Sequence, residues 1–208
     1  MAKLYLAALL AVGAASVQAQ PLSPTVPVQP SVDSVETRQA LRDLSVCLAE
    51  ARPGWARRTL SHPYLSESQA RVAAESLRGT DNCIRGPEAE LTLRTSGMVG
   101  SLAEHFLRAE IGRVDLARLG AALATMPPLN ASEDFALCVA ARHPAAARAL
   151  ALSEPGSDAE MQAVGQIARG IGPCTNQGEQ LTVDLQALRA LTSTALYRGV
   201  TSVLSARN

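Results

Sequence analysis

The sequence predicts an all-α protein in which a unit of roughly four helices and one disulfide occurs twice and packs into one domain. Three observations lead to this prediction. The chain resembles itself at a shift of 91 residues. Apolar residues recur at helical spacing, and no stretch alternates apolar and polar residues for long enough to indicate a strand. Each copy also contains two cysteines that are 36 residues apart.

Identical residues of the two copies coincide at this shift without a gap. The matched pairs include Asp43 with Asp134, Cys47 with Cys138, Pro53 with Pro144, Arg57 with Arg148, Ser66 with Ser157, Arg78 with Arg169, Gly79 with Gly170 and Cys83 with Cys174. Past the second cysteine the shift falls to 90 residues, and Leu91, Thr92 and Arg108 match Leu181, Thr182 and Arg198. We therefore expect repeat 1 with a connecting helix at residues 36–126 and repeat 2 at residues 127–208.

The two repeats are expected to form one cooperative domain. Their apolar stripes contain many alanines, which bury little area, so each copy should lack enough core to fold by itself.

The segment before the repeats has two parts. Residues 1–19 combine a basic start at Lys3, an apolar run and a small-residue cleavage pattern, which is typical of a secretory signal peptide. The apolar run is shorter than the roughly 20 residues of a membrane span, so we expect no membrane insertion after cleavage. Residues 20–35 place prolines at three-residue spacing and predict a disordered linker outside the domain.

A proline separates the first two helices of each copy. Apolar positions predict a first helix at about residues 36–51 in repeat 1 and 132–141 in repeat 2. Pro53 and Pro144 end these helices and suit the first turn of the next, which should reach Leu60 and about Leu152.

The third helix begins with a capping box in both copies, and it is expected at residues 67–78 and 158–169. The boxes are Ser66 with Gln69 and Ser157 with Glu160. Gly79 and Gly170 follow these helices, in the place where a left-handed C-terminal cap belongs.

The fourth helix follows a loop that carries the second cysteine of the copy. Its apolar residues are Met98, Leu102 and Phe106 in repeat 1 and Leu185, Leu188, Leu191 and Ala195 in repeat 2, and it should end near Arg108 or Arg198. Between the copies, a short helix is expected from Asp115 to Thr125, because Pro127 and Pro128 stop it.

Four cysteines in an exported chain are expected to be oxidised, and four cysteines allow three pairings. Two copies can share a fold only if each closes its own bond, which predicts Cys47 bonded to Cys83 and Cys138 bonded to Cys174. Zinc binding is the competing interpretation, but it requires closely spaced cysteine pairs, which are absent from the sequence. We expect no metal and no cofactor.

Charged residues that occur in both copies are expected to hold helices in register. We predict at least one buried or half-buried pair of a carboxylate with a guanidinium in each copy. The residues expected to form such pairs are Asp43, Arg57, Arg108, Asp134, Arg148 and Arg198. The alternative interpretation is an arginine cluster that binds an anionic ligand.

Candidate ligand-binding residues are those that only repeat 1 contains, namely Trp55, His62, Tyr64 and His105. The turn between two helices, where His62 and Tyr64 lie, can present side chains to a ligand. The structural alternative makes Trp55 a core or interface residue and His105 a surface histidine. The sequence has three histidines without metal-ligand spacing and no nucleophile motif, so we predict no catalytic or metal-binding residue and favour a protein that is not an enzyme.

The charge and the aromatic content argue against a nucleic-acid partner. Basic and acidic residues balance at 19 each, without the excess of basic charge that phosphate backbones require, and aromatic residues make up only 3% of the chain.

The order of signals in each copy resembles small exported proteins of Gram-negative bacteria that have no assigned activity. These signals are a cysteine in the first helix, an Arg-Pro or His-Pro step, a serine-capped third helix, a second cysteine and the ending Leu196, Tyr197 and Arg198. The resemblance covers residues 40–200 and implies export, but it transfers no site.

Our hypothesis is a periplasmic or secreted helical protein, braced by disulfides, that serves as a non-enzymatic binding or assembly module for an unknown protein partner. The alternative is a small-ligand binder or an enzyme that uses Trp55, His62, Tyr64 and His105.

Overall fold

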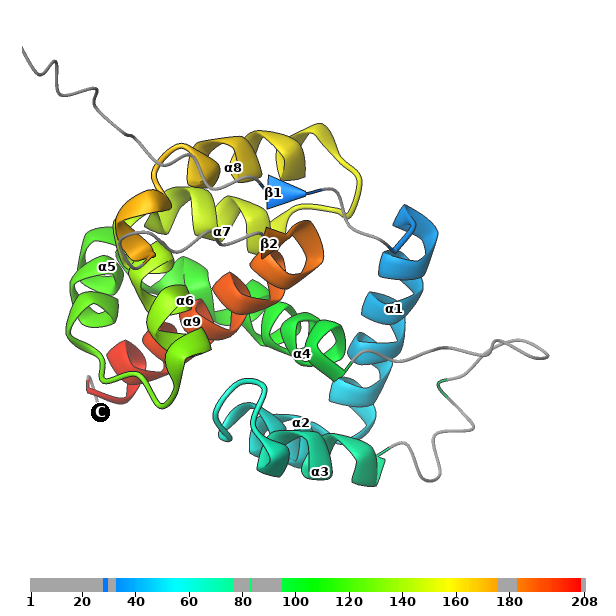
Figure 1. The fold of residues 1–208 in the computed structure, drawn as a ribbon. Coiled ribbons are helices and arrows are strands. Elements are labelled where there is room, and N and C mark those ends of the chain that lie inside the picture. Colours follow the sequence, from blue (N-terminus) through cyan, green and yellow to red (C-terminus); the bar gives the residue numbers. More distant parts are fainter. Residues whose placement is uncertain (1–27, 30–32, 77–82, 84–94, 176–182, 207–208) are drawn as a thin grey trace, which may run out of the picture.

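A computed structural model of the chain describes residues 28–29, 33–76, 83, 95–175 and 183–206. Within these residues the protein is all-α, with nine α-helices, two 3₁₀ turns and one pair of two-residue strands (Figure 1). None of the helices in the described ranges is long and apolar enough to cross a membrane.

The names repeat 1 and repeat 2 denote residues 36–126 and 127–208, the two copies predicted from the sequence. Repeat 1 contains α1 (Val35–Ala51), α2 (Pro53–Leu60), α3 (Glu67–Ser76) and α4 (Thr95–Glu110), and repeat 2 contains α6 (Ala131–Arg142), α7 (Pro144–Leu152), α8 (Asp158–Ala168) and α9 (Leu185–Ser205). The connecting helix is α5 (Leu116–Thr125). The remaining elements are the 3₁₀ turns η1 (Ile111–Arg113) and η2 (Gly172–Cys174) and the strands β1 (Val28–Gln29) and β2 (Val183–Asp184).

The break between the first and second helix has the same cause in both repeats. Arg52 leaves the helical conformation at φ −140° and ψ 61°, and His143 does so at φ −129° and ψ 51°. A proline follows each of them, and proline disfavours helical geometry in the residue before it. Pro53 and Pro144 then occupy the first position of α2 and α7.

Both predicted capping boxes are present. The Ser66 hydroxyl accepts the Gln69 backbone N–H at 3.1 Å, and the Gln69 side chain accepts the Leu65 N–H at 2.9 Å. In repeat 2 the same two bonds join Ser157 to Glu160 at 3.2 Å and Glu160 to Gly156 at 2.7 Å. These bonds satisfy amide groups that the helix itself leaves free and so determine where α3 and α8 begin.

The residue before each capping serine has a positive φ, at positions that coincide in the two repeats. Leu65 has φ 62°, and Gly156 has φ 79°. In repeat 2 glycine also permits close packing, because a Cβ at this position would lie 2.8 Å from the Val35 side chain. In repeat 1 the Leu65 side chain is exposed, so there is room for a side chain at this position. The positive φ of Leu65 still strains its backbone.

The prediction of a left-handed cap at Gly170 is wrong. Of the described glycines only Gly156 has a positive φ, and the C-cap residue of α8 is Arg169, in a right-handed conformation. Close packing explains the glycine instead, since a Cβ on Gly170 would lie 2.2 Å from the His143 ring. Gly79, the matching residue of repeat 1, lies outside the described residues.

The helix α9 is longer than predicted. It continues past Arg198 to Ser205, because Gly199 stays helical and packs closely, since a Cβ there would lie 2.7 Å from the Leu123 side chain. The expected end near Arg198 came from the analogy with Arg108. α4 ends at Glu110, near Arg108 as predicted.

The strand pair was not predicted. Val28 and Gln29 pair in parallel with Val183 and Asp184. Val28 also packs against a cluster of buried residues that includes Val183. The expectation that residues 20–35 lie outside the domain is therefore wrong for Val28 and Gln29, because an apolar side chain and two backbone pairings attach them to repeat 2.

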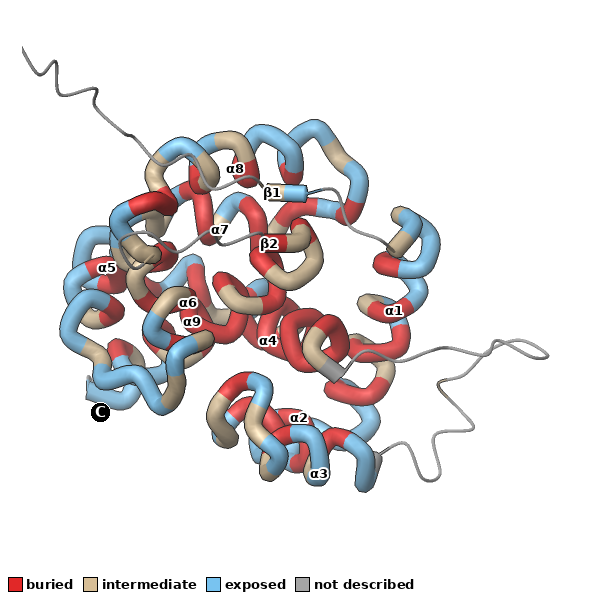
Figure 2. The backbone as a smooth tube through the Cα atoms, in the orientation of Figure 1, coloured by how far each residue is buried: buried red, intermediate tan, exposed pale blue. Residues whose placement is uncertain are grey.

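The helices α4 and α9 form the centre of the molecule, where Figure 2 shows their residues mostly buried. α1 packs on α4, and α5, α6 and α7 pack on α9, while α2 and α3 pack on each other. At the crossing of the two central helices, a Cβ on Gly100 would lie 2.5 Å from the Cβ of Ala190. These two residues coincide at the 90-residue shift, so α4 and α9 touch at matching positions of the two repeats.

The buried apolar residues form one core shared by both repeats and a second core inside repeat 2. The shared core includes Leu48 and Leu102 from repeat 1 and Leu196 and Val200 from repeat 2. The second core, around Leu150, Ile167 and Leu188, is made of repeat 2 residues with Val28 packed against it. The repeats thus pack as one domain, and repeat 1 has its core only in common with repeat 2.

Each repeat contains one disulfide, in the pairing predicted from the equal spacing of the cysteines. Cys47 of α1 is bonded to Cys83, and Cys138 of α6 is bonded to Cys174 of η2, with no free cysteine left. Each bond ties the first helix of its repeat to the segment that precedes the fourth.

Replacing Gly100 with alanine is expected to lower the free energy of unfolding by about 1–3 kcal/mol, the usual cost of overpacking. The new Cβ would meet both the Cβ and the Cα of Ala190, at 2.5 and 2.6 Å, so a helix backbone would have to move. Gly54→Ala is the matched control, because a Cβ there meets nothing within 4 Å. We expect the control to be stabilised by about 0.5–1 kcal/mol. Urea unfolding of both variants measures the contrast, and equal effects would argue against the close crossing.

Candidate functional site

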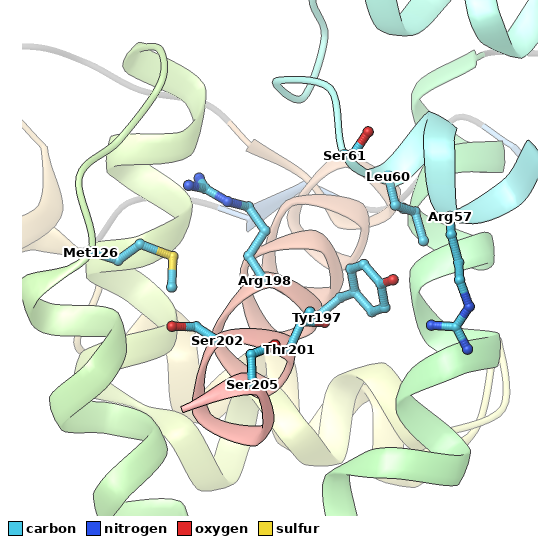
Figure 3. A pocket seen from close by; sticks show the side chains of 9 residues that line it. All are labelled: Arg57, Leu60, Ser61, Met126, Tyr197, Arg198, Thr201, Ser202 and Ser205. Carbon is cyan, nitrogen blue, oxygen red and sulfur yellow. The ribbon is translucent and has the colours of Figure 1, made fainter. Parts of the chain in front are cut away.

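An open pocket of about 410 Å³ lies where the second helix of repeat 1 meets the last helix of repeat 2 (Figure 3). Its lining combines two arginines, a tyrosine, four hydroxyl side chains and two apolar side chains: Arg57, Leu60, Ser61, Met126, Tyr197, Arg198, Thr201, Ser202 and Ser205. Because both repeats contribute residues, the pocket forms only when they pack together.

The residues that α9 contributes lie on one face of the helix. Tyr197, Thr201 and Ser205 are spaced four residues apart, and Arg198 and Ser202 form the adjacent row. Such spacing places side chains one above another on a helix. Thr201, Ser202 and Ser205 are exposed, so the last two turns of α9 present polar groups to the pocket, whereas the preceding part of the helix is mostly buried.

The guanidinium of Arg198 is held in place by Glu133. One N–H of Arg198 donates to Glu133 Oε2 at 2.5 Å, and a second donates to the Pro127 carbonyl at 3.4 Å. Glu133 is buried, with only 6% of its side chain exposed. A carboxylate fixed in this way determines where the remaining N–H groups of its arginine partner lie.

Glu133 also joins two turns that border the pocket. Its Oε1 accepts the backbone N–H of Tyr64 at 3.0 Å, and its Oε2 accepts that of Leu129 at 2.9 Å. The side chain of Asn130 donates to the Tyr64 carbonyl at 2.7 Å. These bonds tie the turn after α2 to the turn before α6, so the position of α2 beside α9 depends on them.

Arg57 lies at the other side of the pocket and is half exposed. Its guanidinium carbon sits 4.3 Å above the centre of the Phe106 ring, a cation–π contact. Its nearest carboxylate oxygen belongs to Glu110, at 3.6 Å, which is an ion pair without a hydrogen bond. No described residue accepts a hydrogen bond from the Arg57 guanidinium, so its N–H groups can bind a ligand.

The residues that only repeat 1 contains are not brought together at this pocket, since none of the four lines it. Trp55 and Tyr64 belong to the shared core. Trp55 donates to the Val72 carbonyl of α3 at 2.7 Å, and burial raises the pKa of Tyr64, which keeps its phenol protonated. His62 is half-buried in the turn after α2, and His105 packs edge-on against Phe106 in α4. Trp55 and Tyr64 therefore act as packing residues.

Of the residues expected in buried or half-buried ion pairs, only Arg198 forms such a pair; the pairs of Arg57 and Arg108 are largely exposed, and the aspartates form none within the described residues. Arg57, Arg108 and Arg198 each pair with a glutamate: Glu110, Glu154 and Glu133. Asp43 and Asp134 are exposed on the outer faces of α1 and α6, and no ion pair in the described ranges includes them or Arg148. An exposed aspartate already has water as its partner, so its recurrence indicated no buried pair.

A buried cluster that sequence reasoning missed joins the two repeats. Arg189 of α9 binds Glu104 of α4 through two hydrogen bonds, at 2.6 and 2.8 Å, and Glu160 of α8 through a third at 2.9 Å. Arg38 of α1 donates to both oxygens of Glu160, at 2.8 and 3.0 Å. The Ser153 carbonyl accepts from Arg189 at 2.7 Å. Two positive and two negative charges thus neutralise one another between α1, α4, α8 and α9.

Hydrogen bonds within the cluster hold the Glu160 carboxylate in its ionised form. Burial acts to raise the pKa of Glu160, but the hydrogen bonds from the Gly156 N–H, Arg38 and Arg189 outweigh it, and the pKa lies below its ordinary value. Burial likewise opposes the charge of Arg189, and the two glutamates overcome this and raise its pKa. Glu160 and Arg189 therefore remain charged at neutral pH and serve structure rather than proton transfer.

The lowered pKa of Glu160 predicts a loss of stability in acid. A carboxyl whose folded-state pKa is depressed contributes its stability above the unfolded-state value, about 4.3, and loses it as the pH falls through the folded-state value. We expect the free energy of unfolding, measured in urea from about pH 7 to about pH 3, to fall more steeply for the wild type than for Glu160→Gln. If the free energy of unfolding falls equally with pH in the wild type and in Glu160→Gln, the lowered pKa of Glu160 does not contribute to stability. Glu154 has a lowered pKa as well, so the variant keeps some pH dependence.

In the described part of the chain, no three His, Cys, Asp or Glu side chains are grouped so that they could hold a metal ion. Comparison of the chain with protein families, curated proteins and solved structures finds no match.

Proposed function

We propose that this protein is an exported, non-enzymatic module that binds a segment of another protein in the pocket between α2 and α9. The observation that carries the proposal is the lining of that pocket, which offers hydrogen-bond donors and apolar surface at a junction of two repeats. A peptide requires this combination, because its backbone and polar side chains need partners while its apolar side chains need a surface to cover.

The same lining favours binding over catalysis. Hydroxyl groups are weak nucleophiles unless a neighbouring base accepts their proton. No histidine, carboxylate or lysine lines the pocket, so Ser61, Ser202 and Ser205 have no such base among the lining residues.

The disulfides support an exported location for this activity. Structural disulfides form and persist in oxidising compartments such as the periplasm or the extracellular medium. Each repeat has one, and no free thiol remains. The partner is therefore sought among proteins of the same compartments.

Site-directed photocrosslinking tests the proposal. In one variant a photoreactive phenylalanine analogue replaces Ser202, which lines the pocket. In the control variant it replaces Gln162 of α8, outside the pocket. Both positions are exposed. After irradiation in an extract of periplasmic and secreted proteins, we expect a discrete adduct from position 202 only, which excess unlabelled protein competes away. Identical adducts from both positions, or none from position 202, would overturn the proposal.

A further inference from the structure

We infer that the segment bound in this pocket is acidic, with carboxylates that reach Arg57 and Arg198 and an apolar residue between them. The inference extends the proposed function, on which its choice of a peptide ligand rests. Every lining residue is either neutral or positively charged, so a carboxylate entering the pocket meets two guanidinium groups and no like charge in the lining.

The guanidinium of Arg57 has N–H groups that can donate hydrogen bonds to a ligand. A guanidinium has five N–H groups, and none of those on Arg57 is hydrogen-bonded to a described residue, since Glu110 lies 3.6 Å away. About half of the side chain is exposed, at 52%. The Phe106 ring beneath it limits its movement, so less conformational entropy is lost when a ligand binds.

Arg198 is the more rigid of the two. Its bonds to Glu133 and Pro127 use only two of its N–H groups and fix the plane of the guanidinium. Glu133 does not line the pocket, and its oxygens already accept from the backbone of Tyr64 and Leu129. This carboxylate thus positions Arg198 from behind and leaves the arginine to face the ligand.

The placement of the two arginines indicates an extended ligand with separated charges. In Figure 3 their guanidinium groups point away from each other, with the ring of Tyr197 between them. Leu60 and Met126 supply apolar surface to the same pocket. A compact anion with a single charged group can engage one arginine, whereas a peptide with acidic residues on both sides of an apolar one can engage both.

Local rather than overall charge produces this preference. The formal net charge of the chain is +0 at pH 7, so general attraction of anions to a basic protein is not the explanation. Binding should depend on the two arginines and weaken with salt, because the contacts are partly exposed.

The test uses a terminally blocked synthetic peptide with two glutamates flanking a leucine, and its glutamine analogue. Calorimetry gives the affinities, and NMR signals of the arginine Nε–H groups report the site. We expect the glutamate peptide to bind the full-length mature protein at least about tenfold more tightly than the glutamine peptide. Its affinity should fall as salt rises from about 50 mM to about 300 mM.

A matched set of variants separates charge from shape. Ser202→Glu places a carboxylate four residues after Arg198 on the same helix face, where it captures that guanidinium, and is expected to abolish binding. Ser202→Gln, of equal size, should bind like the wild type, as should Gln162→Glu, which adds the same charge outside the pocket. Arg57→Gln removes the exposed arginine without touching Glu133 and should weaken binding about tenfold.

The outcomes distinguish this inference from the proposed function. Equal affinity for the two peptides, or equal behaviour of Ser202→Glu and Ser202→Gln, would overturn it. Citrate that binds as tightly as the glutamate peptide would overturn the peptide ligand and indicate a small-anion site. A crosslinked partner that binds through a segment without acidic residues would leave the proposed function intact and refute the inference. Binding of the glutamate peptide without any crosslinked partner would support the preference for acidic ligands but count against the proposed protein partner.

Discussion

Residues 36–126 and 127–208, produced as separate oxidised fragments, are expected to lose most of their structure and to regain helicity when mixed. The shared core contains residues of both fragments, and α4 packs on α9 across the division. The bonds between Glu104 and Arg189 cross it as well, so separation leaves buried charges of both fragments without their partners.

The two fragments should not behave alike. Residues 127–208 retain the second core, around Ile167 and Leu188, together with the disulfide between Cys138 and Cys174. Fragment 36–126 keeps its disulfide and most residues of the shared core, but in the intact protein residues of repeat 2 complete that core. A domain of this size with an incomplete core is marginal at best. We therefore expect fragment 36–126 to be the less helical of the two.

Far-ultraviolet circular dichroism measures this result. The spectrum of the equimolar mixture should exceed the sum of the separate spectra, while each fragment at doubled concentration serves as the control for self-association. Two sharp thermal transitions that also add up to the full-length curve would show independent domains instead and refute the shared core.

Local signals in the sequence were sufficient for most of the helix boundaries. Pro53 and Pro144 restrict the residue before them, and the serines of the capping boxes bond to amides only three residues away. Because these effects act within a few residues, they hold whatever the rest of the chain does. The cysteine pairing was a longer-range prediction, and the equal spacing in two copies made it possible.

Contacts between distant helices could not be predicted in the same way. Arg38 and Glu160 are 122 residues apart, and Glu104 and Arg189 are 85 apart, so only the packing brings them together. One signal did exist. Glu160 stands where the matching capping box has Gln69, and Arg189 interrupts an otherwise apolar run beside Leu188.

The pocket was predictable in its residue types but not in its location. Arg57 and Arg198 were both named, as members of different matched pairs, and an anionic ligand was the alternative use for them. Nothing in the sequence indicated that these two would line one pocket. Ser202 and Ser205 lie beyond the predicted end of the last helix, so the polar face of α9 could not be recognised.

Replacing Arg189 with methionine is expected to lower the free energy of unfolding by about 3–5 kcal/mol, the usual result of removing one partner from a buried ion pair. Only 3% of its side chain is exposed, and the same is true of Glu104. Methionine fills part of the space but donates no hydrogen bond, so Glu104 keeps a buried charge without a guanidinium. The Ser153 carbonyl also loses its donor. Native proteins are stable by only about 5–15 kcal/mol, so this single change removes a large share.

The same substitution at Arg58 is the control, because that residue is 58% exposed and its partner Glu75 lies 4.0 Å away. Its removal should change stability by less than about 0.5 kcal/mol. Adding Glu104→Gln to Arg189→Met removes the uncompensated charge and should recover part of the loss. Urea unfolding of the oxidised proteins gives all three values. If Arg189→Met costs no more than Arg58→Met, or if the second substitution destabilises further, the cluster does not hold the repeats together by charge.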